Sequence, residues 1–245
     1  MAADEPTKAW SSIVPEFYYD LISRIPPGVL LTLLVAYEFG VLSEDNIDRI
    51  FRANAGLVTA LSVFLLGIGY SVGLCLSVPG SKFRGSFFSR AIKHLRPFQK
   101  EWLEKASRIP PFKLLNLDGK TDWTQTDYRN MLWLVHYHLK LQSVDAKVML
   151  PKMTAEVMLF CNTAISVLVW LAVHSMHSVC LRTWPRPSVF ITSTAVAIIM
   201  VITGRRAAQG LIDRRCYYLG VFLGKSLKPE HLGDGLETSV DRGER

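Results

Sequence analysis

Residues 53–81 read ANAGLVTALSVFLLGIGYSVGLCLSVPGS, a run of 29 residues without Asp, Glu, Lys or Arg. A bilayer core is about 30 Å thick, and an α-helix of roughly 20 apolar residues crosses it. Two further uncharged runs cover residues 157–181 and 187–204, and a fourth run, 25–43, is interrupted only by Glu38. Buried helices of soluble proteins rarely need such lengths. The sequence therefore predicts an integral membrane protein with four transmembrane helices.

The composition limits what the rest of the chain can be. The chain has 245 residues, of which 49% are hydrophobic, and four spans would place about 80 of them in lipid. The remainder is short for a large soluble domain, which commonly has about 100–150 residues. The four cysteines show no CxxC or zinc-like spacing and indicate small apolar side chains. We expect no disulfide framework, no metal and no cofactor.

The distribution of charge predicts the orientation in the membrane. The net charge is +7, and residues 82–156 hold 14 Lys and Arg against 7 Asp and Glu. Lys and Arg favour the cytoplasmic side of short loops, so both termini and this segment are predicted to be cytoplasmic. The first 20 residues lack the basic start and apolar core of a cleavable signal peptide. The positive charge indicates contact with anionic lipid, and nucleic-acid binding is not expected.

The predicted fold is all-α and has five segments. In residues 1–25, apolar side chains recur with i, i+3, i+4 spacing, which predicts an amphipathic helix lying on the inner leaflet. Alternatively, this face packs on another subunit or on the cytoplasmic helices. The other segments are transmembrane helices 1 and 2 (26–81), a basic cytoplasmic helical segment (82–154), transmembrane helices 3 and 4 (155–204), and a basic juxtamembrane helix with a disordered tail (205–245).

Two backbone motifs predict local geometry. Pro26-Pro27-Gly28 is predicted to break the first helix, because proline removes a backbone donor and glycine frees the next turn. The chain would then turn from the membrane surface into the bilayer. Gly69 and Gly73 form a small-xxx-small pair, which favours close approach of another helix.

Polar groups inside the predicted spans are candidate functional residues. Ionisable and polar side chains are costly in lipid, so Glu38, Asn162, His174 and His177 would face a bundle interior or a water-filled pore. A ring of Glu38 carboxylates would favour cations. Alternatively, Glu38 reaches the outer headgroups and the histidines are wetted there. His174 and His177 share one helical face and could be a metal-ligand pair, but no carboxylate or third ligand is apparent nearby.

Basic residues outside the spans are candidate contacts for an anionic ligand or for lipid. Arginine suits this role because it forms charge-assisted hydrogen bonds to anionic oxygens. The candidates are Arg90, Lys93, Arg96, Arg205, Arg206, Arg214 and Arg215.

No common enzyme motif is present. The chain has no GxSxG, Walker A or HExxH sequence. Arg129 and His136 have the Arg-x6-His spacing of HEPN-type RNases, with Asn130 after the arginine, but about one such match is expected by chance. His136 and His138 are two residues apart and point to different sides of a helix. We expect the protein not to be an enzyme.

Two segments carry a resemblance to known proteins. Residues 16–28, EFYYDLISRIPPG, and residues 155–162, AEVMLFCN, resemble segments of a group of small bacterial multi-pass membrane proteins. The size and layout of the chain are similar to those of transmembrane effectors of anti-phage defence systems, which open pores or disrupt the inner membrane when a partner sensor signals. The resemblance implies this class of role and the bacterial inner membrane as location.

The leading hypothesis is an oligomeric inner-membrane effector or channel-like protein. Membrane lipids and further copies of the chain would be its partners, and a cytoplasmic sensor protein or a small nucleotide would signal to residues 82–154. Two alternatives remain open. One is a non-conducting membrane scaffold or assembly partner, and the other is a membrane-bound HEPN-like RNase.

Overall fold

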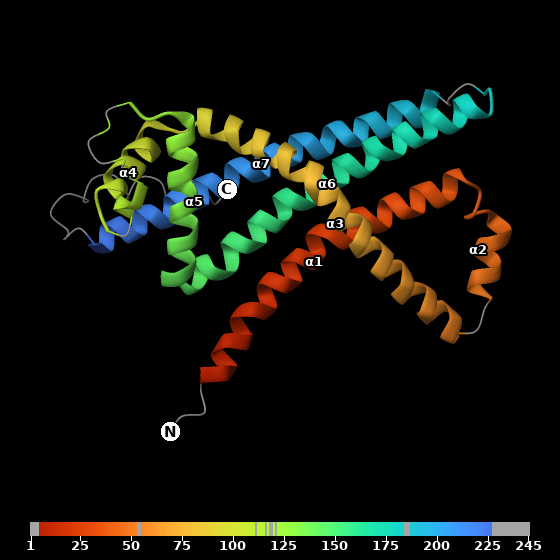
Figure 1. Ribbon diagram of the computed structural model, residues 1–245, viewed down its shortest axis with the longest axis horizontal. Helices are drawn as coiled ribbons and strands as arrows, with labels where there is room; N and C mark the ends of the chain where they lie inside the picture. Colours follow the sequence, from red (N-terminus) through yellow and green to blue (C-terminus); the bar gives the residue numbers. More distant parts are fainter. Residues whose placement is uncertain are drawn as a thin grey trace, which may run out of the picture. The chain divides into compact units, whose positions relative to one another are not determined.

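In the residues that it describes, the computed structural model consists of helices joined by short turns and loops, and it contains no strand there. The described residues are 5–52, 55–110, 112–115, 117, 120, 122–183 and 187–226. They form α1 (Glu5–Glu38), α2 (Glu44–Phe51), α3 (Ala55–Lys93), α4 (Pro97–Ser107), a short 3-10 helix η1 (Phe112–Leu115), α5 (Gln125–Gln142), α6 (Val144–Cys180) and α7 (Pro187–Ser226) (Figure 1). The predicted all-α class is confirmed.

Four helical segments are long and apolar enough to cross a membrane, as the uncharged runs predict. They are Phe17–Glu38, Ala55–Lys93, Val144–Cys180 and Pro187–Gly224. The protein is therefore a membrane protein by the length and composition of its helices.

The chain divides into two compact units. The first unit comprises Met1–Phe88 and Pro151–Gln209, and the second comprises Ser89–Leu150 and Gly210–Arg245. Each unit has its own buried residues and is described by itself below.

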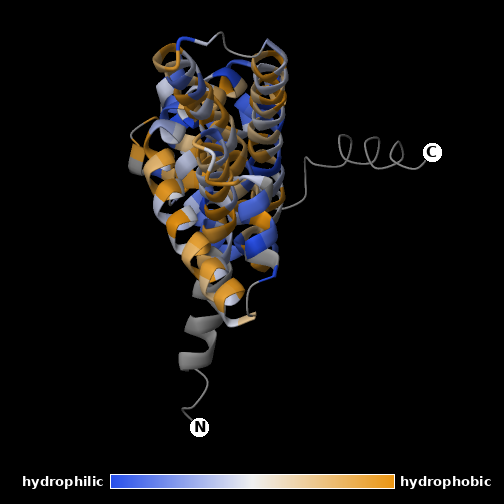
Figure 2. Ribbon diagram, turned by 90° about the vertical axis from the view of Figure 1, so that its right-hand side faces the viewer, coloured by the Kyte–Doolittle hydropathy of each residue, from blue (hydrophilic) through white to orange (hydrophobic). Residues whose placement is uncertain are grey.

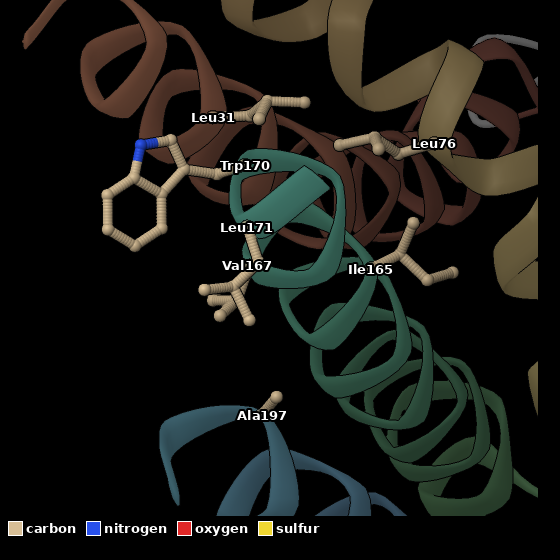
Figure 3. Close-up of a cluster of buried hydrophobic side chains, with 7 residues drawn as sticks. All are labelled: Leu31, Leu76, Ile165, Val167, Trp170, Leu171 and Ala197. Carbon is tan, nitrogen blue, oxygen red and sulfur yellow. The ribbon is translucent and has the colours of Figure 1, made fainter. Parts of the chain in front are cut away.

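Helix α6 is the centre of the first unit. In the most apolar 18-residue stretch of α6, 56% of the residues are buried, whereas the corresponding shares for α1, α3 and α7 are 22%, 17% and 11%. Hydrophobic residues are numerous along the helices (Figure 2), and many large apolar side chains, such as Phe64 and Val78, are exposed, as expected where lipid is the solvent. The buried cluster between the helices consists of Leu31, Leu76, Ile165, Val167, Trp170, Leu171 and Ala197 (Figure 3).

The prediction that Pro26-Pro27-Gly28 breaks the first helix is wrong. Helix α1 runs through this motif without interruption. Pro27 has no N–H, so the Ser23 carbonyl, one turn earlier, loses its helical donor. Asn162 Nδ2 of α6 donates to that carbonyl at 3.0 Å. Ser166 Oγ, also on α6, donates to the Pro27 carbonyl at 2.9 Å.

The physical reason for the difference is that a neighbouring helix supplies the missing donor. A transmembrane helix tolerates proline when adjacent side chains satisfy the freed carbonyl. Asn162 and Ser166 are fully buried, so their hydrogen bonds are shielded from competing solvent. Local propensity alone contains no information about such a partner.

Glycines allow α1 and α3 to meet along their backbones. A Cβ atom on Gly28 would collide with the carbonyl oxygen of Gly69. A Cβ on Gly73 would collide with the carbonyl oxygen of Arg24. The structure thus places the small-xxx-small pair of α3 directly against α1.

The second unit contains α4, η1, α5 and the last turns of α7. Thr124 caps α5: its side chain accepts from the backbone N–H of Asp127, and the Asp127 carboxylate accepts from the Thr124 N–H at 2.7 Å. Thr124 and Asp127 together form a capping box at the start of α5. Helices α3 and α4 are separate, because the chain is not helical between Lys93 and Pro97. Proline fits the first turn of a new helix.

Helices α6 and α7 extend beyond the predicted spans. Helix α6 begins at Val144 and passes through Pro151 without a break. The predicted basic juxtamembrane helix is the continuation of α7 to Ser226. The tail predicted to be disordered lies mostly outside the described residues.

Substitution of two glycines on α3, Gly73 and Gly67, tests the close approach of α1. Gly73→Ala should lower the free energy of unfolding by about 1–3 kcal/mol, because the helices must move apart to admit a methyl group. The measurement is unfolding of the full chain in mild detergent on titration with SDS, followed by circular dichroism.

Gly67→Ala is the matched control on the same helix. A Cβ at Gly67 meets nothing within 4 Å, so this variant should be neutral or up to about 1 kcal/mol more stable. Equal losses in both variants would contradict the packing described here.

A double-mutant cycle tests the hydrogen bond to the freed carbonyl. Asn162→Ala should cost about 1–2 kcal/mol in wild type, because the buried Ser23 carbonyl loses its donor. With Pro27→Ala the backbone N–H returns, so Asn162→Ala should cost about 1 kcal/mol less in that background. The same SDS titration measures all four proteins, and strict additivity would contradict the proposed compensation.

Candidate functional site

Glu38, His174 and His177 meet in the first unit. Glu38 is the last residue of α1, and the histidines lie near the end of α6, on one face because they are three residues apart. Glu38 Oε2 lies 2.8 Å from His174 Nδ1, and Glu38 Oε1 lies 2.9 Å from His177 Nδ1. One carboxylate therefore bridges both imidazoles. We call these residues the Glu38 cluster.

The Glu38 cluster is largely buried. The side chains of Glu38 and His174 are each 10% exposed, and that of His177 is 26% exposed. The His174 ring stacks on Trp170, with 5.7 Å between ring centroids, and Phe39 lies 5.1 Å from the His177 ring. Aromatic rings thus exclude water from much of the cluster.

The sequence-based statement that no carboxylate lies near the histidine pair is wrong. Glu38 supplies one from 136 residues away in the chain, so proximity in sequence could not reveal it. Within the described residues, no group of three or more His, Cys, Asp or Glu side chains is arranged to hold a metal ion.

Hydrogen-bond chemistry fixes the tautomers. An ionised carboxylate has no proton to donate, so both Nδ1 atoms donate to Glu38. In a neutral imidazole the other nitrogen, Nε2, is then an acceptor. His174 Nε2 is buried and has no hydrogen-bond partner among the described residues. With neutral imidazoles the cluster carries one negative charge and one unused acceptor.

A cleft of about 440 Å³ lies beside the Glu38 cluster. It is bounded by the ends of α1 and α6, by residues after α6 and by the start of α7. Besides the cluster, its walls consist of Tyr37, Trp170, Ser178, Leu181, Thr183 and Val189.

Asn162 does not belong to this site. It lies twelve residues before His174 on α6, about 18 Å along the helix. Its Nδ2 donates a hydrogen bond to the Ser23 carbonyl, and its buried Oδ1 lies next to Gly80. The four polar residues singled out in the sequence therefore divide into a three-residue cluster and a separate structural residue.

The predicted basic contacts differ in exposure. Six of them are exposed, and Arg215 is the exception, because its side chain is only 1% exposed. Its guanidinium lies 4.9 Å from the centroid of the Trp133 ring. The prediction of a surface role for Arg215 is therefore wrong, since the residue belongs to the core of the second unit. The exposed residues are Arg90, Lys93, Arg96, Arg205, Arg206 and Arg214.

The structure does not bring Arg129 and His136 to a shared open site. Arg129 is exposed on α5, whereas His136, two turns later, is buried. Burial, with further contributions from Arg215 and Lys140, lowers the pKa of His136 to about 3. A buried neutral imidazole is poorly placed to exchange protons with a bound RNA.

Comparison of the chain with protein-family models, with curated proteins and with solved structures finds no match. The resemblance carried by residues 16–28 and 155–162 therefore stays a prediction. The two segments do contact each other, because Asn162 of the second binds Ser23 of the first.

The low pKa of His136 predicts acid sensitivity. Below about pH 6.5, His136 takes up a proton in the unfolded chain but stays neutral in the folded chain. The free energy of unfolding therefore has its full value above about pH 6.5 and decreases as the pH falls toward about 3. The loss should reach up to about 1.4 kcal/mol per pH unit. His136→Gln should flatten this dependence between pH 4 and 6.5, measured by detergent unfolding.

The control is His94→Gln, which removes an exposed histidine of the same unit. A slope that is unchanged in His136→Gln, or reduced equally in both variants, would contradict the assignment.

Proposed function

We propose that the chain is an oligomeric channel-like protein of the bacterial inner membrane that alters ion flux on a cytoplasmic signal. The observation that carries the proposal is the Glu38 cluster, a buried carboxylate with two histidines at the ends of helices long enough to span a membrane. Ionisable groups in membrane helices are costly and commonly mark ion or proton pathways.

The charge of the cluster favours cations. With neutral imidazoles its net charge is negative, and acidic side chains along a pore select cations. The unused acceptor on His174 would also suit a proton. Copies of the chain around a common axis would bring several such clusters together.

The helix directions support the proposed topology. Glu38 ends α1 and His174 lies near the end of α6, and the two side chains touch. With both termini in the cytoplasm, transmembrane helices 1 and 3 run outward, so both ends reach the outer side. Lys and Arg in residues 82–156 favour the cytoplasm for that segment. The cluster would then face the outer leaflet.

The cytoplasmic part would receive the signal. Arg90, Lys93 and Arg96 are exposed, so they are available to a small nucleotide, an acidic surface of a sensor protein or anionic lipid. A role in anti-phage defence, in which infection supplies the signal, follows from the resemblance and from this arrangement.

A non-conducting scaffold is the second candidate. In the most apolar stretches of α3 and α7, only 17% and 11% of the residues are buried. The exposed apolar surface of these helices could pack against another subunit as well as against lipid. The RNase alternative is disfavoured by the burial of His136.

Replacing Glu38 tests the proposed pathway. Expression of the wild-type chain in bacteria, together with its genomic neighbours, should depolarise the inner membrane, and a voltage-sensitive dye measures this. Glu38→Gln keeps the shape of the side chain but removes its charge, so depolarisation should fall at least about tenfold.

Asp45→Asn is the control, because Asp45 is an exposed carboxylate on α2. It should depolarise like wild type. A flat membrane potential with wild-type protein confirmed in the membrane would favour the scaffold, and equal depolarisation by Glu38→Gln would remove the cluster from the pathway.

A further inference from the structure

His174, one of the residues that line the cleft beside the Glu38 cluster, has a hydrogen-bond acceptor without a partner among the described residues. His174 is 8% exposed, its Nδ1 is committed to Glu38, and its Nε2 is buried without a partner. A buried polar atom without a partner costs free energy comparable to a lost hydrogen bond, so such an atom needs an explanation. A ligand that donates a hydrogen bond would satisfy it.

The charge around the cleft indicates the sign of that ligand. The cluster carries one negative charge when its imidazoles are neutral, and no Lys or Arg is among the described residues that line the cleft. Tyr37 and Trp170 contribute aromatic rings to the walls, and aromatic faces attract cations. A positively charged ligand is therefore favoured over a neutral or anionic one.

The size and apolar walls indicate the rest of the ligand. A volume of about 440 Å³ lies in the range of small-molecule sites. Leu181 and Val189 line the cleft together with the Trp170 ring, and they would cover an apolar stem. The indole N–H of Trp170 is also buried without a partner, so a ligand oxygen beside the ammonium group would be accommodated.

We propose that this cleft binds a primary ammonium group on a small apolar stem, with an ammonium N–H donating to His174 Nε2 and the charge balanced by Glu38. The proposal names the ligand class of the site in the proposed function and rests on that site. Binding itself requires no ion flux. The ammonium group comes either from a free amine or from the headgroup of an aminophospholipid.

The first test compares three probes that share one ring and differ in the head group. Full-length protein in nanodiscs of phosphatidylcholine and phosphatidylglycerol is titrated calorimetrically with benzylammonium, benzyl alcohol and benzyltrimethylammonium. Benzylammonium should bind saturably and at least about tenfold more tightly than the other two, because only it has both the charge and the N–H donors. Equal binding of the trimethyl probe would overturn the hydrogen bond to His174, and equal binding of the alcohol would overturn the charge requirement.

Variants locate the binding. Glu38→Gln and His174→Phe should each weaken benzylammonium at least about tenfold, whereas the exposed control Asp45→Asn should bind like wild type. Unchanged binding in both variants would overturn the proposal. Because the three probes are compared on wild-type protein, the test does not depend on the variants folding.

Nanodiscs of a second lipid composition identify the source of the amine. If phosphatidylethanolamine replaces phosphatidylcholine and weakens benzylammonium several-fold, the lipid headgroup competes for the site. Unchanged affinity assigns the site to a free amine. Saturable binding by a protein that does not depolarise membranes would support this inference while contradicting the proposed function, so the two can fail separately.

Discussion

The first unit depends on one missing backbone donor. Pro27 cannot bond the Ser23 carbonyl, and a carbonyl facing lipid at that depth would be costly. Asn162 removes this cost only if α6 crosses α1 at this residue. Gly28 and Gly73 let α3 approach α1 at nearly the same point. The positions of α1, α3 and α6 are thus fixed around a single turn, and the buried hydrophobic cluster of the unit includes residues of the same three helices.

The sequence predicts the helices better than their partners. Uncharged runs are long enough to identify all four spans, because lipid imposes a minimum length. The expected break at Pro26-Pro27-Gly28 fails because the donor that compensates for it lies on another helix, at Asn162. Residues 144–154 and 205–226 extend α6 and α7 although they are charged, since hydropathy reports the lipid boundary and not the end of a helix.

The sequence identifies the residues of the candidate site but does not predict that they contact one another. Glu38, His174 and His177 stand out as ionisable groups in apolar runs, but their contact spans 136 residues of chain and leaves no periodic signal. One clue in the sequence is that the first and third of four consecutive spans run in the same direction, so their C-terminal ends lie on the same side of the membrane. For Arg215 and His136 the sequence is misleading in another way. Their residue types suggest a role at the surface, yet both side chains are buried in the second unit. Burial of such groups depends on packing that composition does not encode.

The continuity of α1 has a mechanical consequence. An unbroken helix of 34 residues is a stiff rod about 50 Å long. It is gripped near Gly28, so that point acts as the fulcrum of a lever, with Glu38 at the tip of one arm about 15 Å away. A rotation of about 5° would move that tip by about 1 Å, which is enough to weaken its hydrogen bonds to the histidines. A force on the N-terminal end of α1 would therefore move the Glu38 carboxylate without any change in secondary structure.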